Sequence, residues 1–97
     1  MSLLTEDEIR INLNALSGWA LNGNSISKTF DSADFPKAIL FVGAVAQISE
    51  CAWHPPDIDI RWNKVTLTLS THDQGGLTEK DFSLAAEIER VAPVKKD

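Results

Sequence analysis

Apolar residues near the start of the chain recur at helical spacing and share one face: Ile9, Leu13 and Leu16. Thr5 and Glu8 precede this run at the spacing of a capping box, in which each side chain accepts a hydrogen bond from the other residue's backbone N–H. Gly18 follows the run, and glycine very often stands just after a helix. The pattern predicts a helix that begins at Thr5 and ends at Gly18.

Two short segments at residues 19–21 and 26–30 follow, and both have strand character. The residues between them, Asn22-Gly23-Asn24, are those that tight turns favour. These segments predict a β-hairpin.

A second helix is predicted from Asp34, a favourable N-cap, to about residue 51. One face carries Phe35, Ile39, Val42 and Ala46, and a second set broadens it, namely Phe41, Val45 and Ile48. A domain of 97 residues cannot readily cover a helix that is apolar over more than one stripe. The pattern therefore favours packing against another subunit, and the alternative is that other elements of the same chain cover the helix.

Apolar and polar residues alternate over residues 57–70, which is typical of half-buried strands. With Asn63-Lys64 as a two-residue turn, apolar residues face each other across the hairpin: Trp62 and Val65, Ile60 and Leu67, Ile58 and Leu69. All of them then lie on one face, so the alternation specifies this register. The pair Asn-Lys lacks the glycine that such turns favour.

A third helix is predicted to begin after Thr78, with Asp81 as the short-armed partner in its capping box. Its buried face would be Leu84, Ala85, Ile88 and Val91, and Pro93 follows its end. The order of elements is therefore α-β-β-α-β-β-α. It predicts a single α+β domain over residues 1–97, with a four-stranded antiparallel sheet and helices packed on one face.

Composition narrows the possible partners and compartments. The formal net charge of -5 disfavours direct binding to nucleic acid, which depends on clustered Lys and Arg. The single cysteine, Cys51, excludes an internal disulfide and a Cys-rich zinc site. No apolar run approaches the length of a membrane span, and the N-terminus lacks a signal-peptide pattern. We therefore expect a cytoplasmic protein that does not bind membranes.

The chemistry-bearing residues gather at one end of the second predicted hairpin. Extending its register places His72 opposite Pro55, one residue from His54, although two adjoining prolines interrupt regular pairing. Imidazole gives and takes protons near neutral pH. Three further residues are expected near the two histidines: Trp53, Trp62 and Asp57. Together they would form an aromatic, proton-transferring pocket for a flat heterocycle.

Other interpretations of these residues remain open. The histidines can be solvated or hydrogen-bonded surface residues, and the tryptophans can be core residues. The two histidines and Asp57 could also bind a metal ion, but the two adjoining prolines make a poor backbone for presenting metal ligands. Cys51 lies three residues before His54, where a thiolate pair is possible, but its place at the end of an apolar helix favours a small buried side chain.

The residues around the histidines resemble the central signature of the pterin-4a-carbinolamine dehydratase family, also called the dimerisation cofactor family. That signature is an acidic residue, three further residues and His-His-Pro, followed by an aromatic residue, another His and an Asp. Its places are taken here by Glu50, His54, Pro56, Trp62, His72 and Asp81. Residues 56–65 and 70–78 read like family members almost residue for residue, and the resemblance covers essentially the whole chain.

The resemblance implies the antiparallel fold predicted above, in a homodimer or homotetramer that binds a pterin substrate. The implied reaction is loss of water from 4a-hydroxytetrahydrobiopterin, or a related pterin, to give quinonoid dihydropterin. That reaction regenerates the cofactor of the aromatic amino acid hydroxylases, and it involves no metal or prosthetic group.

The resemblance also suggests roles for individual residues. His54 and His72 are the acid–base candidates. Four residues are expected to contact the substrate: Trp62, Asp57, Trp53 and Pro55. Three are expected to support the site structurally: Glu50, Asp81 and Thr78. Of these, Asp81 would cap its helix and hold the loop that bears His72.

The chain departs from the family at one place in the signature, where Pro55 stands for the second histidine. Proline has no side-chain donor or acceptor and no backbone N–H. Two functions therefore stay open. The first is a dehydratase that works with two imidazoles, and the second is a catalytically weakened member that acts as a protein-binding or assembly factor, as some relatives do. A chain that does both is also compatible with the sequence.

Overall fold

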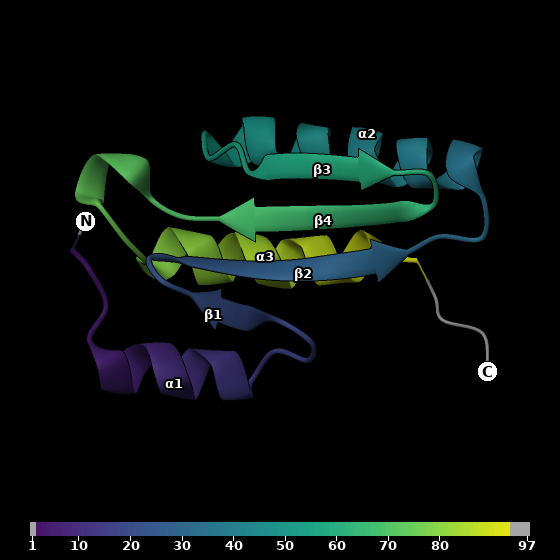
Figure 1. Ribbon diagram of the computed structural model, residues 1–97. Helices are drawn as coiled ribbons and strands as arrows, with labels where there is room; N and C mark the ends of the chain where they lie inside the picture. The colour runs from purple at the N-terminus through teal and green to yellow at the C-terminus, as the bar shows by residue number, and fades with distance from the viewer. Residues whose placement is uncertain (1, 94–97) are drawn as a thin grey trace.

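The computed structural model describes residues 2–93 of the chain. Its elements follow the predicted order, with one added 3-10 turn: α1 (Glu6–Asn14), β1 (Ala20–Asn22), β2 (Ser25–Asp31), α2 (Phe35–Ala52), β3 (Asp57–Arg61), β4 (Lys64–Leu69), η1 (His72–Gln74) and α3 (Glu79–Val91). The strands form one antiparallel sheet in the order β1-β2-β4-β3. Figure 1 shows α2 and α3 side by side behind this sheet. The predicted α+β fold is confirmed.

The core lies between the sheet and the helices. Strand alternation sends one set of side chains into it from β2 and β4: Ile26, Phe30, Val65, Leu67 and Leu69. Helix α3 adds Phe82, Leu84, Ala85 and Ile88. Ile9 and Leu13 of α1, and Leu16 just after it, pack against the same cluster. The opposite face of the sheet has no helix over it in Figure 1 and carries hydroxyl side chains, among them Thr29 and Thr66, whose oxygens lie 2.7 Å apart.

The predicted capping boxes are present at both ends of the chain. In α1, Thr5 and Glu8 exchange backbone–side-chain hydrogen bonds of 2.9 and 3.1 Å. In α3, the side chain of Asp81 accepts from the backbone N–H of Thr78 at 2.9 Å. The predicted end of the first helix was too late, because α1 ends at Asn14 and Gly18 follows in the left-handed region with φ of 85°.

The buried face of α2 differs from the one that the sequence favoured. Four residues of this helix are buried, namely Ala38, Phe41, Val45 and Ser49. Phe35 and Ile39, predicted to lie on the main apolar face, are 46% and 43% exposed. The broadening residues Phe41 and Val45 therefore face the sheet, while much of the predicted stripe points outward. Periodicity alone did not distinguish the two stripes because both are apolar.

The register of the β3–β4 hairpin is shifted by two residues from the predicted one. Ile60 pairs with Val65 and Ile58 with Leu67, so Trp62 and Asn63 form the turn. Two hydrogen bonds to Ser32 hold Asn63 outside the ladder. The Asn63 side-chain amide donates to the Ser32 carbonyl at 2.9 Å, and the Ser32 N–H donates to the Asn63 carbonyl at 2.8 Å. A shift of two residues preserves the faces, and the predicted apolar alternation therefore survives the error.

By length and composition alone, α2 is apolar enough to cross a membrane, with a mean hydropathy of 1.3 over its 18 residues. Such a helix is weak evidence for a membrane span, since the core helix of a soluble protein meets the same criterion. The buried residues of α2 belong to the core described above. The absence of membrane binding stays a prediction.

We predict that Ser49→Ala stabilises the protein. The buried Ser49 hydroxyl finds no hydrogen-bond partner among the described residues, and such a group costs about 1–3 kcal/mol. Removing it should raise the free energy of unfolding, measured by urea denaturation, by about 1 kcal/mol beyond the gain of about 0.5 kcal/mol that the higher helix propensity of alanine contributes. A loss of stability in Ser49→Ala would contradict this account of the core.

Candidate active site

Segments far apart in the sequence meet at one end of the sheet. The C-terminal end of α2, the start of β3, the end of β4, η1 and the start of α3 all lie at the left of Figure 1. The antiparallel order explains this meeting, because β3 begins where its partner β4 ends. Both histidines belong to connections at this end, as the sequence predicts: His54 joins α2 to β3, and His72 begins η1.

The end of α2 fixes the position of His54. Trp53 caps the helix with φ of 53°, in the left-handed region that residues other than glycine rarely adopt. This turn lets the His54 N–H donate to the carbonyl of Ser49 at 3.0 Å. Pro55 and Pro56 then restrict the backbone up to the first residue of β3. The imidazole is thereby directed inward, and His54 is only 7% exposed.

A buried carboxylate receives the His54 ring. Asp81 is fully buried, and its Oδ1 lies 2.6 Å from His54 Nε2. Its Oδ2 accepts from the Thr78 N–H at 2.9 Å and from the Thr71 hydroxyl at 2.8 Å. An ionised carboxylate only accepts hydrogen bonds, so we assign the shared proton to His54 Nε2, which then donates to Oδ1.

The same network extends to the residue that precedes His72. The Thr71 hydroxyl gives its proton to Asp81, so the Thr78 hydroxyl, 2.8 Å from it, donates to Thr71. The Thr71 carbonyl accepts from the N–H groups of Gln74 and Gly75, each at 3.0 Å, and closes the η1 turn. Asp81 thus connects the α2–β3 connection to the η1 loop, which confirms its predicted position as a helix cap beneath that loop.

His72 lies at the surface and lines a polar pocket of about 310 Å³. The other lining residues come from the β1–β2 turn, β2, β3, β4, the β4–η1 connection and the loop after η1: Asn24, Ser25, Asp57, Thr68, Ser70 and Gly75. A hydrogen bond of 2.9 Å from the Ser70 hydroxyl to the Asn24 carbonyl connects two of these segments. Of the predicted site residues, His72 and Asp57 are therefore brought together.

The expectation that both imidazoles share one cleft is not met. His54 does not line the pocket of His72, and its Nε2 is engaged by Asp81. The sequence located the two histidines at the same end of the hairpin correctly. It did not indicate that one of them faces inward, because that orientation depends on the left-handed cap at Trp53.

The aromatic wall of the predicted pocket is also absent within the described chain. Trp62 sits in the β3–β4 turn, at the opposite end of β4 from His72, and is 69% exposed. Trp53 lies beside His54 in sequence but is 86% exposed. Pro55 and Glu50 are exposed as well, and Glu50 contributes its carbonyl, which accepts from the Trp53 N–H at 3.2 Å. Substrate contacts by Trp53 and Pro55 stay predictions.

Sequence reasoning missed two features of the site. Thr71 is buried and links Asp81 to the η1 loop, and Ser25, Thr68 and Ser70 line the pocket. The hydroxyl residues that alternate with Val65, Leu67 and Leu69 were the available signal, because they mark the face of β4 away from the core. Within residues 2–93 no group of three His, Cys, Asp or Glu side chains is arranged to hold a metal ion.

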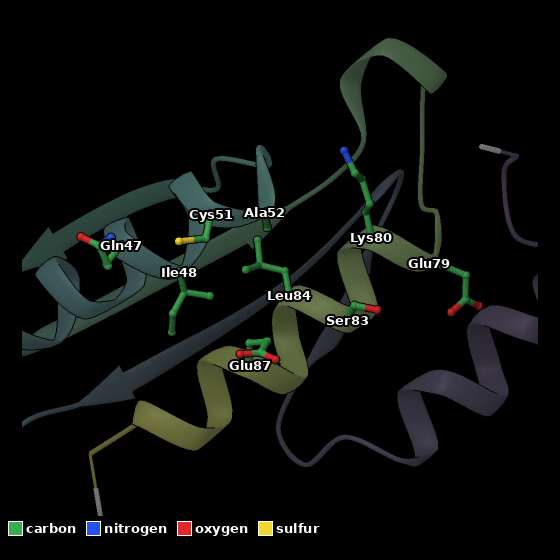
Figure 2. A pocket seen from close by; sticks show the side chains of 9 residues that line it. All are labelled: Gln47, Ile48, Cys51, Ala52, Glu79, Lys80, Ser83, Leu84 and Glu87. Atoms are coloured by element: carbon green, nitrogen blue, oxygen red, sulfur yellow. The ribbon is translucent and has the colours of Figure 1, made fainter.

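A second, more apolar groove runs along the outside of the helix layer. It has a volume of about 560 Å³ and lies between α2 and α3. Figure 2 shows Ile48 and Cys51 of α2 on one side of the groove and Leu84 and Glu87 of α3 on the other. Cys51 is exposed there, which corrects the expectation of a buried thiol. Neither histidine lines this groove.

We predict that Asp81→Ala is strongly destabilising. The substitution leaves the Thr78 N–H, the Thr71 hydroxyl and the His54 Nε2–H without their acceptor in a buried site. The free energy of unfolding should fall by about 3 kcal/mol or more in urea denaturation. Arg90→Ala, an exposed charged residue on the same helix and outside the linings of both grooves, should change it by less than about 0.5 kcal/mol. Equal effects of the two variants would contradict the network.

Comparison with known proteins agrees with the fold. The family model described as pterin 4 alpha carbinolamine dehydratase matches residues 2–91. A protein of Roseiflexus castenholzii, provisionally named pterin-4-alpha-carbinolamine dehydratase, is 58% identical over 90 residues, which are 93% of this chain and 97% of that protein. A protein of Chloroflexus aurantiacus with the same provisional name is 54% identical over 91 residues, covering 94% and 98% of the two chains.

Two solved structures share the fold. The crystal structure of a transcriptional coactivator/pterin dehydratase from Brucella melitensis superposes with a TM-score of 0.90 at 34% identity, over 94% of this chain and 99% of that one. A pterin dehydratase-like RuBisCO assembly factor of the alpha-carboxysome gives a TM-score of 0.65 at 23% identity, over 76% and 88%, and supports the fold alone. From the family match and these relatives, the chain belongs to the pterin-4a-carbinolamine dehydratase family.

Proposed function

We propose that the protein catalyses loss of water from a 4a-hydroxytetrahydropterin, with His72 as the group that exchanges a proton with the substrate. The observation that carries this proposal is the placement of His72 in a polar pocket built from several segments of the chain. Pockets for small ligands are typically about 300–1,000 Å³, and this one has about 310 Å³. Family membership supplies the class of reaction.

The reaction needs a proton donor at the departing oxygen. Hydroxide is a poor leaving group, so the C4a hydroxyl must be protonated as its bond to carbon breaks, and N5 must lose a proton. An imidazole at the mouth of a pocket can perform such a transfer near neutral pH, and one positioned acid–base group contributes about 10²–10⁴-fold in rate. Hydroxyl and amide groups of the lining, such as Ser25 and Asn24, can bind the polar edge of a pterin.

In this proposal His54 is a positioning residue instead of a second catalyst. Its ring is buried and its Nε2 is held by Asp81, which leaves His72 as the imidazole open to the pocket. Through Asp81 and Thr71, His54 helps fix the η1 loop relative to the sheet. The catalytic role that the resemblance suggests for His54 is thereby replaced by a structural one.

The first test is turnover of a 4a-hydroxytetrahydropterin by purified protein, corrected for the reaction in buffer. We expect acceleration by the wild type and a loss of about 10²-fold or more in kcat for His72→Ala, since it removes the donor. Asp73→Ala, the next residue of the same loop and outside the pocket lining, should retain wild-type activity. If the wild type gives no acceleration and one protein partner binds stoichiometrically, the assembly-factor function would be supported in place of catalysis.

We further propose that the protein self-associates through the outer surface of α2 and α3. Leu40 is 73% exposed on α2, and the groove of Figure 2 is lined mainly by apolar surface. Lys80 and Glu87 stand at this groove, seven residues apart on α3. A two-fold axis near Ser83 would therefore set Lys80 of each copy against Glu87 of the other, and self-complementary contacts of this kind are typical of homodimers.

A charge swap tests this second proposal. We expect Lys80→Glu and Glu87→Lys each to lower the molar mass measured by light scattering after gel filtration, because each places like charges together in the interface. The double variant K80E/E87K should restore the wild-type mass. A monomeric wild type, or single variants with unchanged mass, would contradict this interface.

A further inference from the structure

The arrangement around His72 leaves one half of the dehydration without a histidine. The reaction needs a donor for the leaving hydroxyl and an acceptor for the N5 proton. Pro55 occupies the signature position of the second histidine, and His54 Nε2 is bonded to Asp81 in the interior. One imidazole, His72, faces the pocket. Another residue of the lining is therefore needed if a side chain of this pocket is to accept the proton.

We propose that Asp57 is this proton acceptor, so that Asp57 and His72 form the acid–base pair of the pocket. This inference rests on the dehydratase function proposed above. Among the lining residues, Asp57 and His72 are the two titratable side chains, and the others are hydroxyl, amide or glycine residues. A carboxylate is ionised at neutral pH and accepts protons there, whereas imidazole can donate them.

The backbone holds Asp57 firmly in this place. It is the first residue of β3 and pairs with Thr68 of β4, which also lines the pocket. Pro55 and Pro56 precede it directly, and their fixed φ angles restrict how the chain enters the strand. Pro55, which stands where the family signature has a histidine, thus contributes to the rigid approach to the carboxylate that we assign as the proton acceptor.

The proposed step balances without any further reactant. The C4a–O bond breaks, and the departing oxygen takes a proton from the His72 imidazolium to leave as water. The N5 lone pair forms the C4a=N5 double bond, and the N5 proton passes to the Asp57 carboxylate. Transfer of that proton from Asp57 to His72, directly or through solvent, restores both groups. The substrate loses one water, and the enzyme is unchanged.

The test compares Asp57→Asn with Asp59→Asn. Asp59 lies two residues along the same strand and on the same face, but it bonds Arg61 at 3.1 Å and does not line the pocket. We expect Asp57→Asn to lower kcat by about 10²-fold or more with KM changed less than about threefold. We expect Asp59→Asn to behave like the wild type.

The pH profile separates a proton acceptor from a residue that only binds substrate. In the wild type, kcat/KM should fall at low pH as the carboxylate is protonated and at high pH as the imidazolium loses its proton. The fall at low pH should disappear in Asp57→Asn and persist in Asp57→Glu, which keeps the carboxylate.

Three results would overturn the assignment. If the wild type is active and Asp57→Asn keeps its kcat, the assignment of Asp57 is overturned, and the proposed dehydratase function is not affected. A rise in KM with kcat and both limbs of the profile intact makes Asp57 a binding residue. A wild type without turnover overturns the proposed function, and the acid–base pair with it.

Discussion

A single buried carboxylate holds together the end of the molecule where the pocket lies. Asp81 accepts hydrogen bonds from the start of its own helix, from the strand extension at Thr71 and from the ring of His54. A fully buried charge is tolerated only when such donors surround it, because its hydration has been lost. The carboxylate therefore constrains the α2–β3 connection and the η1 loop together, and these flank the residues that line the pocket.

This arrangement divides the titratable residues of the candidate site between interior and surface. His54 and Asp81 form its buried part, while His72 and Asp57 form the part that solvent and a ligand can reach. The substitution at Pro55 falls between the two parts and leaves the buried one intact. A chain can in this way lose one imidazole from a proton-transfer site and still keep the loop, the pocket and a second titratable group. The proposed acid–base pair of Asp57 and His72 needs only the residues of this outer part.

Much of this was predictable from the sequence, and the failures have definable causes. Local patterns were enough to place the helix caps and the faces of the strands, because each involves residues close together in sequence. The caps depend on the pairs Thr5–Glu8 and Thr78–Asp81, and the strand faces depend on the alternation over residues 57–70. The turn of the second hairpin was misplaced because Ser32, distant in sequence, binds Asn63. The burial of His54 was missed for a similar reason, since its partner Asp81 lies 27 residues away. Contacts of this range are not encoded in periodicity.

A crystal structure of the protein with a bound dihydropterin would test the central claim most directly. The account predicts that the pterin occupies the pocket within hydrogen-bond distance of Asp57 and His72, while His54 Nε2 remains bonded to Asp81. A pterin seated against the His54 ring, with the bond to Asp81 broken, would contradict it.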